Sequence, residues 1–227
     1  MKENICKILE NNELNLLKEI SEGYSEDCKF CVEDKYGKKY MIRISKSDNL
    51  AQKKMEEKIL SSCSGCNPNV LPCCIEVNEF KKSKIYTIYT WVEGNPLKES
   101  LMTFSDVEQF NLGAQAGKVL RNIHNIKIDE TGFIDKSKYI ISIKDKVNLY
   151  KNCPNRIEED RVLLDYISKN INNPVLYNNY SYLHGDFQLV NFLYNPQQNL
   201  VRIIDFERCR IGNRYEDFFL LNFMIEK

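Results

Sequence analysis

Residues 184–191 read His-Gly-Asp-Phe-Gln-Leu-Val-Asn, and residues 203–207 read Ile-Ile-Asp-Phe-Glu. Asn191 follows Asp186 by five residues, and Asp205 ends a second apolar run beyond an Asn-Pro-Gln-Gln-Asn turn. This order matches the kinase pattern His-x-Asp-x-x-x-x-Asn followed, one hairpin later, by Asp-Phe. The first part of the pattern occurs by chance, but the hairpin and the strand that runs into Asp205 make the whole specific. A polar turn followed by an aspartate at the end of a strand is the simpler alternative.

These three polar residues suit phosphoryl transfer, which depends on metal ions at the phosphates, in-line positioning and a carboxylate near the attacking hydroxyl. Asp186 would accept or orient the hydroxyl proton, while Asn191 and Asp205 offer the oxygen ligands that Mg²⁺ prefers. His184 is predicted to fix the loop that presents Asp186. The chain has only two histidines, which excludes a His-rich metal site and leaves few options for a Ser-His-Asp triad.

Composition narrows the possible partners. The chain has 227 residues, 43% of them apolar and 28% charged, which is enough for two small lobes with a core. Its 32 basic and 32 acidic residues give a net charge of zero, whereas a nucleic-acid partner usually demands a basic excess. The sequence contains neither an apolar signal core nor a run that could span a membrane, so a cytoplasmic protein with no membrane partner is expected. The oligomeric state is not predicted.

The chain has nine cysteines, and in the cytoplasm these should stay reduced. Cys63 and Cys66, followed by the adjacent Cys73 and Cys74, suggest a zinc site as one interpretation. The second pair lacks the two-residue spacing of a zinc knuckle, so free thiols near a loop are the preferred interpretation.

The first part of the chain is mostly strand. Apolar spacing predicts amphipathic helical turns in residues 1–20, and alternating apolar residues predict a β-hairpin from 24 to 45. A helix capped by Ser47 or Asp48 follows, with Met55, Ile59 and Leu60 as its buried stripe. Two further strands are expected at residues 75–80 and 85–92.

The second part, after a Glu-Gly-Asn-Pro linker at residues 93–96, is mainly helical. A helical pattern is present from Phe104 to Ile126, and the helix itself is expected to end at His124. Another covers residues 156–171, where the residues expected to face inward are Ile157, Leu163, Leu164 and Ile167. The predicted fold class is α+β, with residues 1–92 as a nucleotide-binding lobe and residues 93–227 as a catalytic and acceptor-binding lobe.

The two motifs resemble those of the aminoglycoside phosphotransferase family, a group of kinase-like small-molecule phosphotransferases that includes choline and macrolide kinases. The resemblance extends to residues 91–94, which look like the segment joining the lobes, to the helix ending at His124, and to Asp217. It implies a protein-kinase-like two-lobe fold, with an antiparallel sheet plus one helix and then a mainly helical lobe. It also implies transfer of the γ-phosphate of ATP or GTP to a hydroxylated small molecule with Mg²⁺, and it does not choose between the nucleotides.

The resemblance assigns Asp186 as the catalytic base and Asn191 and Asp205 as metal ligands. The family places a basic residue on its third strand to contact the nucleotide phosphates, and Arg43 stands there in this sequence. Arginine suits the role because its fork binds phosphate oxygens bidentately, although an outward-facing strand residue is the alternative. A glutamate of the following helix should pair with it; the candidates are Glu56, which is preferred, and Glu57.

The linker implies the site of the nucleotide base. By resemblance, backbone groups of Thr90 and Val92 would hold the base between the lobes. Tyr89 and Trp91 could serve there as well, but a core position is the simpler interpretation for at least one of them.

Departures from the family keep other interpretations open. The first hairpin has no glycine-rich loop, and the sequence ends at Lys227, so the second lobe is expected to lack C-terminal helices that help to wall the acceptor site. A protein kinase would need an Ala-Pro-Glu segment after Asp205, and none is present. An inactive nucleotide-binding pseudokinase or a truncated interaction module is the alternative from a different class.

The first candidate acceptor is an aminoglycoside-like or other amino-bearing molecule. Carboxylates in the predicted second-lobe helix would attract such a cation: Glu158, Glu159, Asp160 and Asp165. A solvated helix face is the alternative, because arginines are interleaved and Arg161 and Asp165 have the spacing of a helix ion pair. Glu207 and Glu216 lie nearer the catalytic strand in the sequence.

Overall fold

The computed structural model describes residues 2–21, 26–64, 70–81, 83–128, 136–175 and 180–219. Its strands are β1 (Leu14–Ile20), β2 (Cys28–Asp34), β3 (Lys39–Lys46), β4 (Cys74–Glu79), β5 (Lys84–Thr90), β6 (Asn95–Pro96), β7 (Tyr180–Leu183), β8 (Phe192–Asn195), β9 (Leu200–Ile203) and β10 (Arg210–Asn213). Its α-helices are α1 (Lys2–Asn11), α2 (Leu50–Ser64), α3 (Leu97–Ser100), α4 (Asp106–His124), α5 (Lys136–Lys151) and α6 (Asp160–Asn170). Short 3₁₀ turns include η1 (Ser47–Asn49), η4 (Leu189–Asn191) and η5 (Arg214–Glu216).

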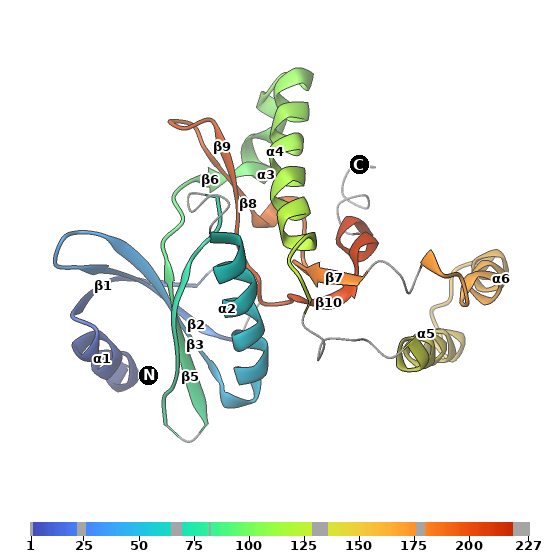
Figure 1. Cartoon of the computed structure of the whole chain (residues 1–227), viewed down its shortest axis with the longest axis horizontal. Helices are drawn as coiled ribbons and strands as arrows, with labels where there is room; N and C mark the ends of the chain where they lie inside the picture. Colours follow the sequence, from blue (N-terminus) through green and yellow to red (C-terminus); the bar gives the residue numbers. More distant parts are fainter. Residues whose placement is uncertain are drawn as a thin grey trace.

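The first five strands form one antiparallel sheet in the order β1-β2-β3-β5-β4 (Figure 1). Its central hairpin, β2–β3, pairs Phe30 with Ile42 and turns at Asp34, whose carboxylate accepts hydrogen bonds from two turn amides. Gly37 completes the turn with a φ of +77°, a conformation that glycine adopts without steric cost. The predicted hairpin is therefore confirmed.

Helices cover both faces of this sheet. Ile5 and Ile8 of α1 pack against one face in a cluster with Phe30, Val32 and other sheet residues. On the other face, α2 contributes Ile59 and Leu60, both fully buried, to the main core. Alternation of side chains across the sheet thus separates two apolar clusters.

Two details of the first part of the chain differ from prediction. The apolar residues after Asn11 do not continue a helix but form the edge strand β1, in which Leu16 and Leu17 are exposed. The helix gives way to the strand at Glu13, whose φ is +52°. Ser47 and Asp48, the predicted caps of α2, lie in the 3₁₀ turn η1 that precedes this helix. The side chain of Lys46, the residue before η1, makes no capping hydrogen bond.

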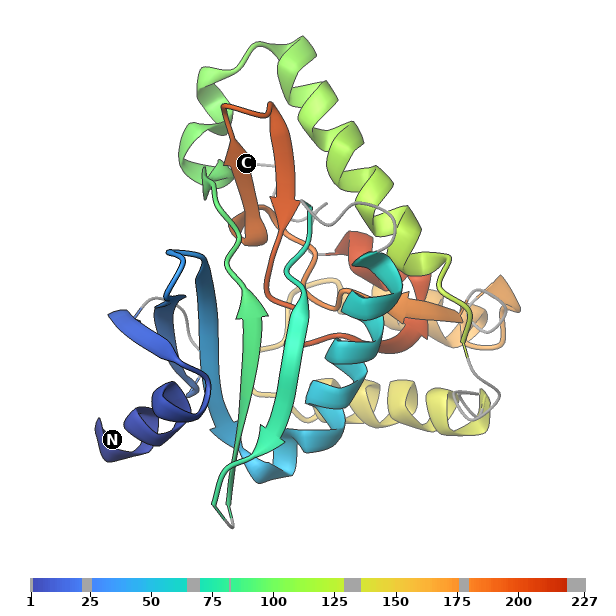
Figure 2. The ribbon, with the colours of Figure 1, turned by 60° about the vertical axis from the view of Figure 1, so that its left-hand side comes forward.

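The second part of the chain packs α4 against the hairpin β8–β9 (Figure 2). Ser105 caps α4 in a reciprocal arrangement with Glu108, and the helix ends at His124 as predicted. The short strand β6 joins the edge of this hairpin, and β7 pairs separately with β10. These contacts hold the two loops that follow β7 and β9 next to each other.

Helices α5 and α6 lie on the side of β7 and β10 away from the five-stranded sheet (Figure 1). The residues of α6 predicted to face inward do so only in part, because Leu164 and Ile167 are half-buried while Leu163 is exposed. Ile157 lies before the helix and is also exposed. No helix of the described residues combines the length and apolar character needed to cross a membrane.

Candidate active site

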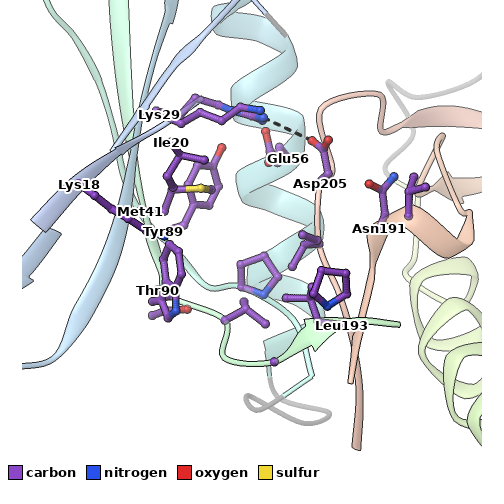
Figure 3. A pocket seen from close by; sticks show the side chains of 18 residues that line it. Lys18, Ile20, Lys29, Met41, Glu56, Tyr89, Thr90, Asn191, Leu193 and Asp205 are labelled. Atoms are coloured by element: carbon purple, nitrogen blue, oxygen red, sulfur yellow. Dashed lines mark ion pairs between the residues drawn. The ribbon is translucent and has the colours of Figure 1, made fainter. Parts of the chain in front are cut away.

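A cavity of about 450 Å³ lies between the five-stranded sheet and the hairpin β8–β9 (Figure 3). Met41 and Leu193 contribute apolar walls from the two sides. The predicted site residues that line the cavity are Arg43, Glu56, Thr90, Val92, Asn191 and Asp205. Asp186 is not among its lining residues but accepts a hydrogen bond from Asn191. The structure therefore brings together residues from distant parts of the sequence.

A glycine at position 185 allows the loop that carries Asp186 to cross the loop that follows Asp205. The φ of Gly185 is +81°, and a Cβ atom there would lie 1.9 Å from the Arg208 carbonyl oxygen. The crossing is held by Asp217, which accepts hydrogen bonds from the amides of His184 (3.0 Å) and Gly185 (2.8 Å). The same carboxylate contacts His124 Nε2 at 2.8 Å. It thereby joins the end of α4 to the loop.

His184 is fully buried between the two loops. Its Nδ1 accepts a hydrogen bond from the Asp186 amide at 3.2 Å, and its Nε2 lies 3.1 Å from the Ile204 carbonyl oxygen. Burial lowers the pKa of this imidazole, more than the nearby Asp217 charge raises it. A neutral ring that accepts at Nδ1 and donates at Nε2 satisfies both contacts, so the geometry fits the predicted structural role.

The Asp186 carboxylate is held by neighbouring donors. Its Oδ1 accepts a hydrogen bond from Gln188 at 2.7 Å and lies 3.6 Å from the exposed Arg208 guanidinium. Its Oδ2 accepts from Asn191 Nδ2 at 3.0 Å, and the same amide nitrogen donates to the Asp186 carbonyl oxygen at 2.8 Å. Donors at both oxygens therefore fix the orientation of the carboxylate.

The oxygens of Asn191 and Asp205 are suited to a hard cation. Because Asn191 donates from its amide nitrogen, its side-chain oxygen is left on the side nearer Asp205 (Figure 3). Among the described residues, Asp205 Oδ1 is buried without a hydrogen-bond partner. Arg43 Nη2 lies 3.5 Å from this oxygen, an ion-pair contact without a hydrogen bond, so a bound cation would add compensation that the protein itself provides only in part. Asp205 also has a φ of +67°, a strained value of the kind concentrated at functional sites.

These two residues fit Mg²⁺ better than a metal that needs a complete protein cage. No group of three His, Cys, Asp or Glu side chains that could hold a metal occurs in the described residues. Mg²⁺ commonly binds one or two protein oxygens and completes its shell with water and substrate phosphates. The zinc alternative for the cysteines stays untested, because Cys66 lies outside the described residues; Cys63, Cys73 and Cys74 form no disulfide.

Arg43 points into the cavity from β3 and is only 3% exposed. Its Nη2 lies 3.5 Å from both Asp205 Oδ1 and Glu207 Oε2, and the ion pair with Asp205 is dashed in Figure 3. Burial alone would lower the pKa of this guanidinium, but the charges of Asp205, Glu207 and Glu56 raise it above its usual value. The outward-facing alternative for Arg43 is therefore wrong.

The expected ion pair between Arg43 and a helix glutamate is not the one that forms. Glu56 is buried, and its Oε2 pairs with Lys53 Nζ at 3.2 Å. Glu57, the rival candidate, pairs with Lys54 at the surface at 2.9 Å. Lys53 is three residues before Glu56 on the same helix, a spacing at which two side chains can pair.

Lys29 is a cavity residue that the sequence interpretation missed. It lies directly opposite Arg43 in the β2–β3 register, and Figure 3 shows its side chain extending toward Glu56 and Asp205. A signal was available, because alternation in a hairpin with this register places Lys29 and Arg43 on one face. The cavity thus receives two cationic side chains from adjacent strands.

The linker end of the cavity is more apolar. The Thr90 amide donates to the Cys73 carbonyl oxygen at 2.9 Å, and its hydroxyl accepts from the Cys73 amide at 2.8 Å. Because the Thr90 amide and hydroxyl are bonded within the protein, a contact from Thr90 to a base would have to come from its carbonyl oxygen. Tyr89 is 1% exposed and belongs to the main core, in agreement with the simpler interpretation of the linker aromatics.

Three of the six acidic residues considered for acceptor binding are engaged within the protein. Asp160 forms a two-pronged ion pair with Arg156 at 2.7 and 3.0 Å. The expected ion pair between Arg161 and Asp165 does not form among the described residues. Glu216 pairs with Arg210 at 2.8 Å and accepts a hydrogen bond from an amide of its own turn. Glu207 contacts Arg43, as described above. Asp160, Glu207 and Glu216 are therefore compensated, whereas Glu158, Glu159 and Asp165 are exposed carboxylates.

Comparisons with known proteins give a family match and similar solved structures. Residues 16–225 match the model of the phosphotransferase enzyme family. A mutant of aminoglycoside 2'-phosphotransferase-IIIa in its GDP complex is 18% identical at a TM-score of 0.74, and the match covers 97% of this chain and 76% of that chain. The streptomycin–ATP ternary complex of APH(2″)-IIa is 20% identical at a TM-score of 0.63, covering 95% of this chain and 73% of that chain.

A third similar solved structure is that of a macrolide phosphotransferase. The apoenzyme of the macrolide 2'-phosphotransferase MphH from Brachybacterium faecium is 12% identical at a TM-score of 0.62, and the match covers 94% of this chain and 74% of that chain. Comparison with curated proteins gave no match. At these identities the solved structures show a shared fold, so the predicted protein-kinase-like α+β fold is confirmed.

Proposed function

This chain belongs to the phosphotransferase enzyme family, and we propose that it transfers the γ-phosphoryl group of ATP or GTP to a hydroxyl of a small molecule. The convergence of Asn191, Asp205 and Arg43 at one cavity, with Asp186 hydrogen-bonded to Asn191, supports this function best. Residues 1–92 would serve as the nucleotide-binding lobe, and residues 93–227 as the catalytic and acceptor-binding lobe. This division stays a prediction.

Asp186 would act on the acceptor hydroxyl. As its proton moves to the Asp186 carboxylate, the acceptor oxygen forms a bond to the γ-phosphorus, and the bond to the β,γ-bridging oxygen breaks. The proton then passes to solvent, and the products are the phosphorylated acceptor and ADP or GDP. The donors Gln188 and Asn191 hold the carboxylate in place for this step.

Asn191 and Asp205 would hold Mg²⁺, which when bound neutralises charge on the phosphates. The buried Asp205 oxygen without a hydrogen-bond partner supports this assignment. Arg43 and Lys29 would contact the phosphates from the sheet, and Val92 with Thr90 would border the base. The cavity of about 450 Å³ falls within the usual size range of small-ligand sites.

For the acceptor, we propose an aminoglycoside-like or other amino-bearing molecule, on the strength of the family and of neighbours described as kanamycin and streptomycin complexes. Of the acidic residues named from the sequence, Asp160, Glu207 and Glu216 are paired within the protein, so the exposed Glu158, Glu159 and Asp165 are the ones that could attract a cation. If the acceptor is a polycation drawn by exposed carboxylates, its KM should rise with ionic strength as the Debye length shrinks to about 8 Å and below. A KM that is independent of salt would contradict this part of the proposal alone.

The function is tested by incubating the purified chain with Mg²⁺ and γ-labelled ATP or GTP against a panel of hydroxylated acceptors. Label should appear in an acceptor, and Asp186→Asn should reduce this transfer by about 10²-fold or more while nucleotide affinity stays within a few-fold. Asp145→Asn is the matched control, since it makes the same change at an exposed residue of α5. Nucleotide binding with neither transfer nor hydrolysis would favour the inactive pseudokinase, and transfer that survives in Asp186→Asn would refute the assigned base.

A further inference from the structure

The two ends of the Arg43 guanidinium face different carboxylates. At the front, Nη2 lies 3.5 Å from Asp205 and from Glu207, where the metal and phosphates are proposed to bind. At the back, Nε lies 3.5 Å from Asp27 Oδ2. That distance is too long for a good hydrogen bond, so the contact is an electrostatic one between two buried charges.

Asp27 contacts side chains from two elements, β3 and α2. The residue immediately precedes β2, and its side chain is 6% exposed. Its Oδ2 accepts a hydrogen bond of 2.6 Å from the hydroxyl of Ser45 on β3 and lies 4.0 Å from the ammonium group of Lys53 on α2. One carboxylate is therefore fixed by a strong neutral donor while it faces two buried cations.

The helix glutamate does not provide this back contact. Glu56 pairs with Lys53 on its own helix, and Lys53 in turn approaches Asp27. The carboxylate that anchors Arg43 from behind thus comes from the start of β2. An arginine without that anchor would be held only by Asp205 and Glu207, the carboxylates at its front.

We propose that Asp27 is a positioning residue that fixes the back of Arg43, so that Nη2 is presented to the nucleotide phosphates. This inference rests on the proposed nucleotide-dependent transfer. When the Mg-nucleotide binds, Nη2 exchanges Asp205 for phosphate oxygens while Nε stays beside Asp27. Because the guanidinium is planar and rigid, fixing one end of the group also fixes the direction of the other end.

The test compares Asp27→Asn with Glu26→Gln. The first variant keeps the shape of the side chain and can still accept from Ser45, but it removes the charge that faces Arg43. The second makes the same charge change at the neighbouring residue, whose carboxylate is 81% exposed and pairs with Lys46 at the surface. Asp27→Asn should raise the KM for nucleotide by about 10-fold and leave the acceptor KM within about 2-fold. Glu26→Gln should leave both near wild type.

A second variant decides the case if Asp27→Asn fails to fold. Ser45→Ala removes only the 2.6 Å hydrogen bond that holds the same carboxylate and changes no charge. It should raise the nucleotide KM by about 3-fold, with the acceptor KM unchanged. A folded Asp27→Asn with wild-type nucleotide KM, or a Ser45→Ala that alters both constants equally, would overturn the proposal. Failure of the proposed function is distinguishable, because then the wild-type chain itself would transfer no phosphate.

Discussion

The crossing at Gly185 makes a strong prediction about substitution by alanine. At a φ of +81°, any L-residue meets a steric cost of about 1–2 kcal/mol. At this position the new Cβ would also lie 1.9 Å from the carbonyl oxygen of Arg208 and 2.9 Å from the Arg210 side chain. The oxygen belongs to the backbone and cannot rotate away, so one loop must move.

Gly37 provides a matched control. Its φ is +77°, almost the same, yet a Cβ there would have nothing within 4 Å. Gly37→Ala should therefore cost about 1–2 kcal/mol. Gly185→Ala should cost about 1–3 kcal/mol more, because forced overpacking adds a term of that size. The reduced conformational freedom of the unfolded chain offsets both variants by a similar amount, so it cancels in the difference.

The same displacement should affect catalysis, since Gly185 adjoins Asp186. A shift of about 1 Å in a positioned group can lower the rate by about 10²-fold. Urea unfolding with linear extrapolation would measure the two free energies, and kcat would be compared at a temperature where all variants remain folded. Equal losses of stability in Gly185→Ala and Gly37→Ala, with kcat unchanged in both, would refute the reasoning about the crossing.

Three further predictions concern the charges of the site. Asp205→Ala should weaken Mg²⁺-dependent nucleotide binding by about 10-fold or more, because a charged metal ligand is lost. Calorimetry with and without Mg²⁺ would measure the two nucleotide affinities. An undiminished Mg²⁺ dependence of binding would exclude Asp205 as a ligand. Arg43→Ala should raise the KM for nucleotide more than the KM for acceptor in steady-state kinetics, whereas equal changes would indicate a folding defect. For His184, burial lowers the pKa in the folded chain, so the unfolded chain binds a proton more readily as pH falls below about 6.5. The free energy of unfolding should then decrease from pH 7 to pH 5 in urea titrations, and an increase over that range would contradict the buried neutral ring.

Sequence reasoning succeeded where the signals were local. The hairpin β2–β3 follows from alternation around a turn, and the helix end at His124 follows from apolar periodicity. It failed where one spacing served two structures. Leu16 and Leu17 fit a helical repeat with the preceding residues, but a break at Glu13 turns them into an edge strand. Pairing with β2 decides the outcome there, and periodicity alone contains no information about that partner.

The candidate site shows the same division. The motif spacing identified Asp186, Asn191 and Asp205, and the structure brings all three together. The partner of Glu56 could not be predicted, because choosing between Lys53 on its own helix and a strand arginine depends on how α2 is rotated against the sheet. The bonds of Asp217 have no local pattern at all; only the resemblance pointed to that residue.

The position of Asp217 has a consequence for the order in which the protein can be completed on the ribosome. The amides of His184 and Gly185 donate to a carboxylate that lies 33 and 32 residues later in the chain, and His124 is separated from the same carboxylate by 93 residues. The sheet of β1 to β5, in contrast, has all of its partner strands once residue 90 has emerged. A nascent chain can therefore form the sheet that carries Lys29 and Arg43 before the rest of the chain has been synthesised. The loop that carries Asp186 acquires its fixed shape only after Asp217 has left the exit tunnel.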